Sequence, residues 1–168
     1  MKKLVSLLII MLLLVGCTSK EKENKKEEKE PISQTGIKYD VKKVGNYEVT
    51  MTIFHSNSCG HCQDLKLWLN TEVSKYPYLK VEMYEASEYY DLYTKVKNKL
   101  NLQEGVPLII IGNDHVLGYA VSLQPEITDY IKKNSTYETC NVVDAIKNNK
   151  DVDACMRKNE FIVEAINK

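Results

Sequence analysis

Two cysteines three positions apart are the residues of this chain best suited to chemistry: Cys59 and Cys62, separated by Gly60 and His61. Thiols at this spacing can alternate between a dithiol and a disulfide, so thiol–disulfide exchange is the leading hypothesis. Cys59 is predicted to be the nucleophile, and Cys62 the resolving thiol that attacks a mixed disulfide at Cys59. The charged form of His61 favours thiolate over disulfide, which makes the pair a better oxidant, and Gly60 leaves the turn unobstructed.

The same spacing is compatible with two other roles. It supplies half of a zinc site, for which His55 and His61 are candidate further ligands. A zinc ribbon would need a second close pair of ligands, whereas Cys140 and Cys155 are far apart in the sequence and His115 is isolated. A purely structural disulfide is the other alternative, although so small a ring gains little stability from chain entropy. We therefore expect no metal and no organic cofactor.

The segments around the motif are expected to place Cys59 at the beginning of a helix. Residues 48–55 are rich in β-branched and apolar side chains and predict a strand, residues 56–58 a turn, and residues 64–70 a helix. Free amides and the helix dipole stabilise an anion in the first helical turn, so Cys59 should ionise more readily than an ordinary thiol. Cys62, one turn further along, should be more shielded.

Downstream of the motif, strands and helices are expected to alternate in a mixed α/β fold. Residues 79–84 alternate like a strand, residues 89–100 predict a helix, and residues 106–111 form a continuous apolar run typical of a buried strand. A Gly-Asn-Asp turn signal then leads into residues 115–119, so the last two strands should form a hairpin. Residues 124–133 predict a closing helix.

This order of elements, with Cys-x-x-Cys after the first strand and Val106-Pro107 opening a later one, resembles the thioredoxin superfamily. The Gly-His dipeptide between the cysteines is similar to that of protein disulfide isomerases. The resemblance covers roughly residues 45–133 and implies a thioredoxin-like fold: a central mixed β-sheet flanked by helices, here with a C-terminal helical extension. It also implies that Pro107 is cis and faces the cysteines, and that the Val106 backbone pairs with an extended substrate. A trans proline at a strand edge is the alternative.

Two positions depart from the pattern of this family. Many thioredoxins carry Trp directly before the first cysteine, where this chain has Ser58, and its only tryptophan, Trp68, is most simply a core residue of the following helix. The family also often places a buried acid six residues before the first cysteine, to help deprotonate the second, and here that position is Ile53. Proton removal from Cys62 would then use water or another residue.

The N-terminal residues indicate export and lipid anchoring. A positively charged start precedes an apolar run over residues 4–15, and the Leu-Val-Gly-Cys that ends it resembles a bacterial lipobox, so residues 1–16 are expected to be a lipoprotein signal peptide. The run is too short for a spanning helix, which needs about twenty residues. Cleavage would leave Cys17 as the lipidated first residue, and two acyl chains anchor a protein stably. Residues 17–36, dominated by Lys and Glu, would be a flexible tether, with a solvated helix over residues 21–30 as the alternative.

A second cysteine pair is expected to be structural. Of the five cysteines, four remain when Cys17 is set aside, and Cys140 and Cys155 are the natural partners in a compartment where disulfides persist. A bridge between them would close a loop of about fifteen residues and contribute about 3 kcal/mol on the chain-entropy account. Such a staple requires that the helix after Cys140 begins beyond it or bends. An auxiliary redox pair and free thiols are the alternatives.

Four tyrosines gather in the middle of the chain, at Tyr84, Tyr89, Tyr90 and Tyr93. We expect them to be partly buried packing residues whose hydroxyl groups reach solvent. A substrate-facing aromatic patch is the alternative.

Together these features predict a membrane-anchored, extracytoplasmic thiol–disulfide oxidoreductase, with a thioredoxin-like domain over residues 37–135 and a helical extension over residues 136–168 packed on it. Its partners would be thiol- or disulfide-containing envelope proteins, a membrane redox partner, and the membrane through Cys17. A formal net charge of zero gives no indication of nucleic-acid binding. A redox-inert thioredoxin-like binding or accessory lipoprotein is the alternative, favoured by Ser58 and Ile53.

Overall fold

The computed structural model describes residues 47–166, and their side chains as far as Phe161. The strands are β1 (Val49–His55), β2 (Leu79–Glu85), β3 (Leu108–Ile111) and β4 (Asp114–Leu117), and the helices are α2 (Gly60–Glu72), α3 (Tyr90–Lys99), α4 (Gln124–Ser135), α5 (Val142–Lys147) and α6 (Val152–Ile166), with short 3₁₀ turns η2 (Val73–Lys75) and η3 (Val121–Leu123). The expected signal peptide, the lipidation residue Cys17 and the tether lie outside the described residues. Within residues 47–166, none of the helices has the length and apolar character needed to cross a membrane.

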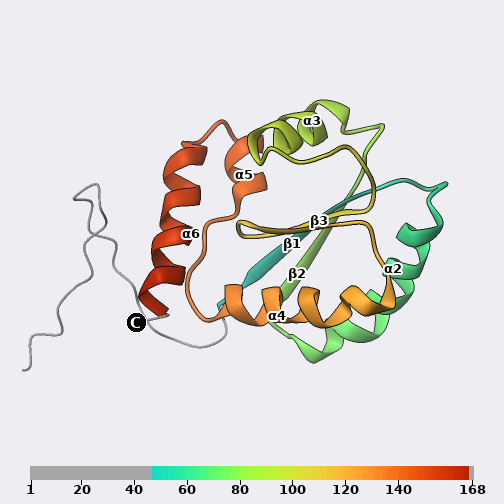
Figure 1. The fold of residues 1–168 in the computed structure, drawn as a ribbon, viewed down its shortest axis with the longest axis horizontal. Helices are drawn as coiled ribbons and strands as arrows, with labels where there is room; N and C mark the ends of the chain where they lie inside the picture. Colours follow the sequence, from blue (N-terminus) through green and yellow to red (C-terminus); the bar gives the residue numbers. More distant parts are fainter. Residues whose placement is uncertain (1–46, 167–168) are drawn as a thin grey trace, which may run out of the picture.

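The four strands form one mixed sheet in the order β2-β1-β3-β4, flanked by helices (Figure 1). β1 pairs with β2 in parallel and with β3 antiparallel, and β3 pairs with β4 antiparallel. The α/β alternation and the closing hairpin that the sequence predicts are therefore confirmed. The parallel pair needs a crossover connection, which α2 supplies.

Most boundaries lie within two residues of the sequence prediction, and three of those that differ have a clear local cause. α2 begins four residues before the predicted helix, at Gly60 instead of Asp64, because Cys59 is its N-cap. β3 begins at Leu108 and not at Val106, since Pro107 has no amide hydrogen to donate to a neighbouring strand. β4 ends at Leu117, before Gly118, whose φ of 83° takes the chain out of the extended conformation.

The central strands bury side chains on both faces, which produces a core on each side of the sheet. On one face, residues of β1 and β3 such as Ile53, Ile109 and Ile111 pack with Leu65 of α2 and Ile127 of α4. This alternation follows from the two-residue period of a strand, so the intervening residues point to the other face. Helices cover both sides of these two strands, so that even Thr52 of β1 is buried.

The second core includes the C-terminal helices. Phe54 of β1 and Ile110 of β3 pack in it with Val96 of α3 and with the buried residues Val143 and Ile146 of α5. Figure 1 shows α3, α5 and α6 on the side of the sheet opposite α2 and α4. The predicted extension thus shares its core with the sheet, and without α5 this sheet face would lose much of its apolar cover.

The β3–β4 hairpin is fastened to α4 at its tight turn. Gly112 has a φ of 60°, and a Cβ atom at this position would collide with the Asn134 side chain. Asn134 Nδ2 donates a hydrogen bond to Asp114 Oδ2 at 2.8 Å, and Lys133 Nζ donates to Asp114 Oδ1 at the same distance. The turn and the helix therefore fit together only because residue 112 has no side chain.

Candidate active site

The Cys-Gly-His-Cys motif lies at the N-terminus of α2, at the end of the strand β1. A turn precedes it, in which the Cys59 amide donates to the Ser56 carbonyl oxygen at 3.2 Å. Cys59 is the N-cap, with an extended backbone (φ −90°, ψ 116°), and its Sγ accepts a hydrogen bond from the Cys62 amide at 3.1 Å. The two cysteines form a disulfide with their Cα atoms 5.2 Å apart. A thiolate at Cys59 would keep the hydrogen bond from the Cys62 amide, and the positive end of the helix dipole would stabilise its charge.

The two sulfurs of this pair differ in accessibility. Cys62 is 0 % exposed and lies on the face of α2 that packs into the molecule, whereas Cys59 is only partly buried. Gly60 and His61, between them, are exposed. A second molecule can therefore reach Cys59 first, and Cys62 can act only on a group already bonded to Cys59.

The segment Val106-Pro107 is brought beside this pair by the tertiary fold. The Cys59 Sγ atom lies 3.6 Å from the Val106 carbonyl oxygen, at a distance suited to a hydrogen bond from the thiol of the reduced form. The Val106–Pro107 peptide bond is cis. The structure thus brings the Val106-Pro107 segment beside the cysteine motif, although more than forty positions separate the two in the sequence.

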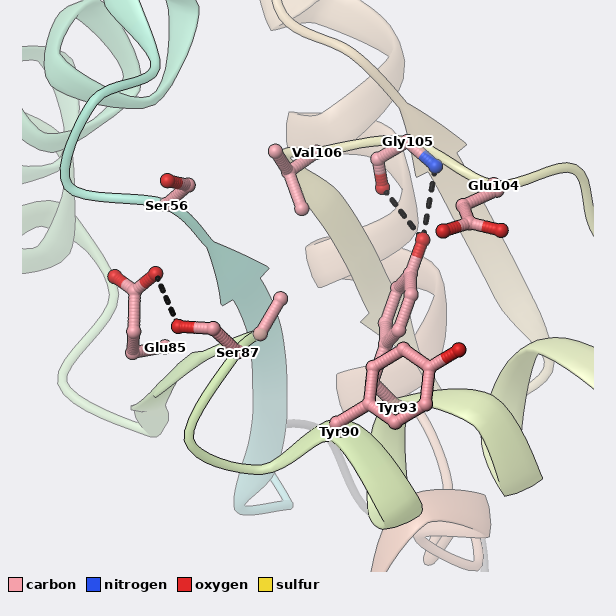
Figure 2. Close-up of a pocket in the computed structure, with 9 residues that line it drawn as sticks. Ser56, Glu85, Ser87, Tyr90, Tyr93, Glu104, Gly105 and Val106 are labelled. Carbon is pink, nitrogen blue, oxygen red and sulfur yellow. Dashed lines mark hydrogen bonds between the residues drawn. The ribbon is translucent and has the colours of Figure 1, made fainter.

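One side of the site contains a hollow of about 310 Å³ that begins at Val106 (Figure 2). Tyr93 fixes its wall: the hydroxyl accepts a hydrogen bond from the Gly105 amide at 2.8 Å and donates one to the Gly105 carbonyl oxygen at 3.1 Å. Glu85 and Glu104 lie on opposite sides of the hollow in Figure 2. The backbone next to the Cys59 sulfur is therefore held in place by a side chain of α3.

A buried histidine packs behind Glu85. His55 Nδ1 lies 3.4 Å from Glu85 Oε2, and neither atom has a hydrogen-bond partner within the described part of the chain. Burial, and secondarily the positive charge of Lys66, lower the pKa of His55 more than Glu85 and Glu88 raise it. His55 is therefore neutral near pH 7, which leaves the Glu85 carboxylate without a cationic partner from this residue.

The other side of the site is apolar. A hollow of about 520 Å³ is lined by His61, Trp68, Tyr119 and the exposed side chains Leu67 and Val121, among others. The Trp68 and Tyr119 rings are stacked at an angle, with centroids 5.9 Å apart. Trp68 packs against the core, as expected, and also forms a wall of this hollow, which its position in the sequence did not indicate.

Ile53, the position where the resemblance would allow a buried acid, is completely buried in the first core. No acid is therefore present at that point of β1. Among the described residues, no three His, Cys, Asp or Glu side chains are close enough together to hold a metal ion. His55 faces Glu85, and His61 is exposed on the helix end.

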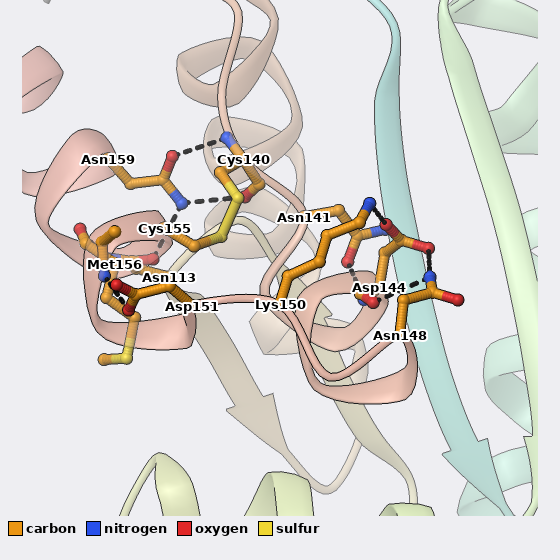
Figure 3. Close-up of a disulfide and its surroundings, with 11 residues drawn as sticks. Asn113, Cys140, Asn141, Asp144, Asn148, Lys150, Asp151, Cys155, Met156 and Asn159 are labelled. Carbon is orange, nitrogen blue, oxygen red and sulfur yellow. Dashed lines mark hydrogen bonds and ion pairs between the residues drawn. A yellow bond between two sulfur atoms is a disulfide. The ribbon is translucent and has the colours of Figure 1, made fainter.

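The second cysteine pair lies on the opposite side of the molecule from α2 and joins the segment before α5 to α6 (Figure 3). Cys140 and Cys155 form a disulfide with Cα atoms 5.4 Å apart. α5 begins after Cys140, at Val142, with Asn141 as its N-cap, which meets the geometric requirement that the sequence set. Cys155 lies on α6 with 5 % exposure, whereas Cys140 is partly buried.

Asn159 of α6 reinforces the same junction. Its Nδ2 donates to the Cys140 carbonyl oxygen at 2.9 Å and to Asn113 Oδ1 at 2.8 Å, and its Oδ1 accepts from the Cys140 amide at 2.7 Å. These bonds tie the connection between α4 and α5 to α6 and to the β3–β4 turn. No sequence signal distinguishes Asn159 from a surface residue of a helix.

The tyrosines divide between the two expected roles. Tyr84 and Tyr93 are buried, but their hydroxyls do not simply face solvent: that of Tyr84 donates to Glu82 at 3.1 Å and that of Tyr93 bonds to Gly105. Tyr89 and Tyr90 are exposed, and Tyr90 lines the hollow beside Val106. The expectation of partial burial is therefore wrong for Tyr89 and Tyr90, and no pattern in the sequence indicated the bond from Tyr93 to the backbone next to the site.

No protein family, curated protein or solved structure matches the chain in the three comparisons made.

Proposed function

We propose that this protein is a membrane-anchored, extracytoplasmic thiol–disulfide oxidoreductase with a thioredoxin-like fold. The observation that carries the proposal is the asymmetric Cys59–Cys62 pair: an accessible sulfur at a helix N-terminus, bonded to a buried one. The mixed sheet, the position of the motif after β1 and the neighbouring Val106–Pro107 segment are compatible with the thioredoxin-like architecture.

In the reducing direction, the Cys59 thiolate attacks one sulfur of a substrate disulfide. A mixed disulfide forms, and the first substrate sulfur leaves as a thiolate that takes a proton from water. Cys62 then loses its proton and attacks the Cys59 sulfur, which forms the Cys59–Cys62 disulfide and releases the second substrate thiol. Two electrons pass from the cysteine pair to the substrate. In the oxidising direction, a substrate thiolate attacks Cys59 and every step runs in reverse.

The residues around the pair have defined tasks in this scheme. The Cys62 amide, which donates to Cys59 Sγ at 3.1 Å, stabilises the attacking thiolate. The Val106 backbone lies beside the reacting sulfur and is proposed to pair with an extended substrate segment. Burial of Cys62 keeps external disulfides away from the resolving thiol.

The direction of electron transfer is decided by the reduction potential of the pair. A value near about −120 mV would identify an oxidant and one near about −270 mV a reductant. The partners proposed are thiol- or disulfide-containing envelope proteins, together with a membrane redox protein that restores the active form. This potential is measured by equilibration with glutathione buffers and quantification of the two thiols of a variant that lacks Cys140 and Cys155.

The anchor is proposed from the sequence of residues 1–36 alone, with Cys17 as the lipidated residue and the charged tether as its link to the domain. A Cys17→Ser variant should move from the membrane to the soluble extracytoplasmic fraction and lose incorporation of labelled fatty acid. Retention of both properties would contradict the lipid anchor without affecting the redox proposal.

Trapping of mixed disulfides tests the proposed activity. A Cys62→Ala variant should accumulate covalent adducts with envelope proteins through Cys59, because the resolving step is removed. The matched control is Cys59→Ala, which keeps one cysteine of the motif but lacks the nucleophile and should form none.

A redox-inert binding lipoprotein is the second candidate, and the apolar residue Ile53 in place of an acid favours it. In that case neither variant would form adducts, and the purified protein would neither reduce nor oxidise a test peptide disulfide. Adducts specific to Cys62→Ala, together with turnover by the wild type, would exclude this candidate.

A further inference from the structure

We propose that the hollow beside Val106 is a subsite for a lysine or arginine side chain that lies close in sequence to the reactive cysteine of the substrate. The inference rests on the proposed function, since it concerns how the oxidoreductase selects its substrate. It assigns specificity to Glu85 and Glu104, neither of which takes part in the exchange chemistry.

The hollow has a size and a position suited to one side chain of a bound peptide. Its volume of about 310 Å³ is at the lower limit of small-molecule sites, which span about 300–1,000 Å³. Val106 forms part of its lining and also lies 3.6 Å from Cys59 Sγ through its carbonyl oxygen. A peptide that pairs with Val106 while its cysteine reacts at Cys59 would therefore carry a neighbouring side chain over this hollow.

The charge of the lining selects the chemistry of that side chain. The hollow is lined by two carboxylates, Glu85 and Glu104, by the hydroxyl groups of two serines and two tyrosines, and by no Lys or Arg among the described residues. Lys97 Nζ lies 3.2 Å from Glu104 Oε2 at the rim, so it balances one of the two negative charges. One carboxylate charge remains in the hollow.

Glu85 carries the uncompensated charge. Its side chain is 13 % exposed, one oxygen accepts only the Ser87 hydroxyl at 3.3 Å, and the other faces the neutral His55. A carboxylate taken out of water without a cationic partner is unfavourable, so a positively charged group in the hollow would gain more from it than from a surface carboxylate. An anionic side chain would be repelled, and an aliphatic one would leave the carboxylate desolvated without compensation.

Tyr93 and Tyr90 extend the match to a long cationic side chain. The methylene groups of Lys or Arg can lie against aromatic rings while the charged end reaches the carboxylates. Figure 2 shows Tyr90 and Tyr93 on the side of the hollow away from Glu85, and the Tyr90 side chain is exposed. Because Tyr93 is fixed by its bonds to Gly105, the wall exists before the substrate arrives.

Peptide binding tests the subsite separately from the redox chemistry. The probes are eight-residue peptides in which serine replaces the reactive cysteine. In each peptide, one of the four positions nearest this serine, two before it and two after it, carries Lys, Gln or Glu. Their affinity for the oxidised protein is measured by calorimetry at low and high salt. In at least one position, Lys should bind about five- to tenfold more tightly than Gln at low salt, and Glu more weakly than Gln.

The variants are Glu85→Gln and Glu104→Gln, with Glu160→Gln as the matched control. Glu104 has a side-chain exposure of 68 %, so its replacement leaves the packing intact even if Glu85→Gln proves unstable. Glu160 is exposed on α6, so the Glu160→Gln variant removes one carboxylate charge outside the hollow. Each hollow variant should reduce the preference for Lys over Gln by several-fold, whereas Glu160→Gln should retain it.

Equal affinity for the Lys and Gln peptides at all positions, or a preference that survives both hollow variants, would overturn the subsite. Failure of the proposed function gives a different result: the cysteine-containing forms of the peptides would undergo no exchange with any sequence. Exchange with all peptides at equal rates and equal affinities would retain the oxidoreductase and reject only the subsite.

Discussion

Removal of the Cys140–Cys155 disulfide should destabilise the protein and leave the proposed exchange chemistry at Cys59–Cys62 intact. The perturbation is the double variant Cys140→Ala/Cys155→Ala. The bridge spans a sequence separation of 15 residues, and closing a loop of this length contributes about 3 kcal/mol on the chain-entropy account. Cys155 is also buried, so its truncation adds a smaller packing loss.

The three hydrogen bonds of Asn159 limit the damage to the native state. They hold the same connection to α6 and do not depend on the disulfide. We therefore expect the variant to fold and to keep both α5 and α6 in place. Most of the effect should come from the larger freedom of the unfolded chain, which also exposes more surface to denaturant.

The loss of stability is measured by urea unfolding, with circular dichroism as the signal. With a denaturant slope of about 2 kcal/mol/M, a loss of about 3 kcal/mol lowers the midpoint by about 1.5 M. A second variant, Cys59→Ser/Cys62→Ser, isolates the bridge: its midpoint should fall by a similar amount when a reducing agent is added. Exchange of a test peptide disulfide by the Cys140→Ala/Cys155→Ala protein should equal that of the wild type.

Two results would refute this reasoning. A midpoint shift below about 0.5 M in both comparisons would show that the bridge contributes little to stability, contrary to the loop-entropy argument. Loss of exchange activity with a fully folded variant would show that the second pair relays electrons, which is the auxiliary redox role left open by the sequence.

Three further predictions concern the fold around the site. Tyr93→Phe leaves the Gly105 amide without its partner, so the free energy of unfolding should fall by about 1–3 kcal/mol in urea titrations, and peptide exchange should slow while the Cys59–Cys62 potential stays unchanged. Gly112→Ala combines a φ of 60° with a collision against Asn134 and should cost at least about 2 kcal/mol, whereas alanine at Gly60, which has open space around it, should cost less than half of that. Burial lowers the pKa of His55 from 6.5, so below that pH the unfolded chain binds a proton that the folded chain does not, and stability falls as the pH decreases from about 6.5 towards 5. His55→Asn should flatten this slope, measured as the urea midpoint at each pH.

Each of these three predictions has a result that contradicts it. Equal stability of Tyr93→Phe and wild type would mean that water replaces the hydroxyl at Gly105. A Gly112→Ala protein as stable as wild type would mean that Asn134 can move away without loss. An unchanged pH slope in His55→Asn would assign the pH dependence to other groups, such as the carboxylates.

The local elements and the position of the Cys59–Cys62 pair at a helix start could be predicted from the sequence because their signals are local. The apolar run that contains β3 and the Gly-Asn turn before β4 specified a hairpin, and a strand followed by a turn placed Cys59 at a helix N-terminus. The difference in shielding between Cys59 and Cys62 also followed from one helical turn of separation. These inferences needed only the spacing at which side chains recur on one face of a strand or a helix.

The surroundings of the pair could not be predicted, because they depend on contacts between distant segments. Glu85 becomes the charged wall of a hollow only when β2 pairs with β1 and sets it beside His55. Tyr93 bonds to Gly105 only when α3 packs under the segment that follows it. A residue's type and neighbours in sequence do not specify these partners.

The sequence alone determined which chemistry is proposed for this chain, because two thiols three positions apart at a predicted helix start are suited to thiol–disulfide exchange. The tertiary structure decided what lies around them: a backbone segment at Val106 within 3.6 Å of Cys59, an acidic hollow on one side and an aromatic one on the other. It also made the last two helices part of the core, through burial of α5 against the sheet. The physical reason is that reactivity is a property of local bonds and dipoles, whereas recognition is a property of surfaces that only the packed chain assembles.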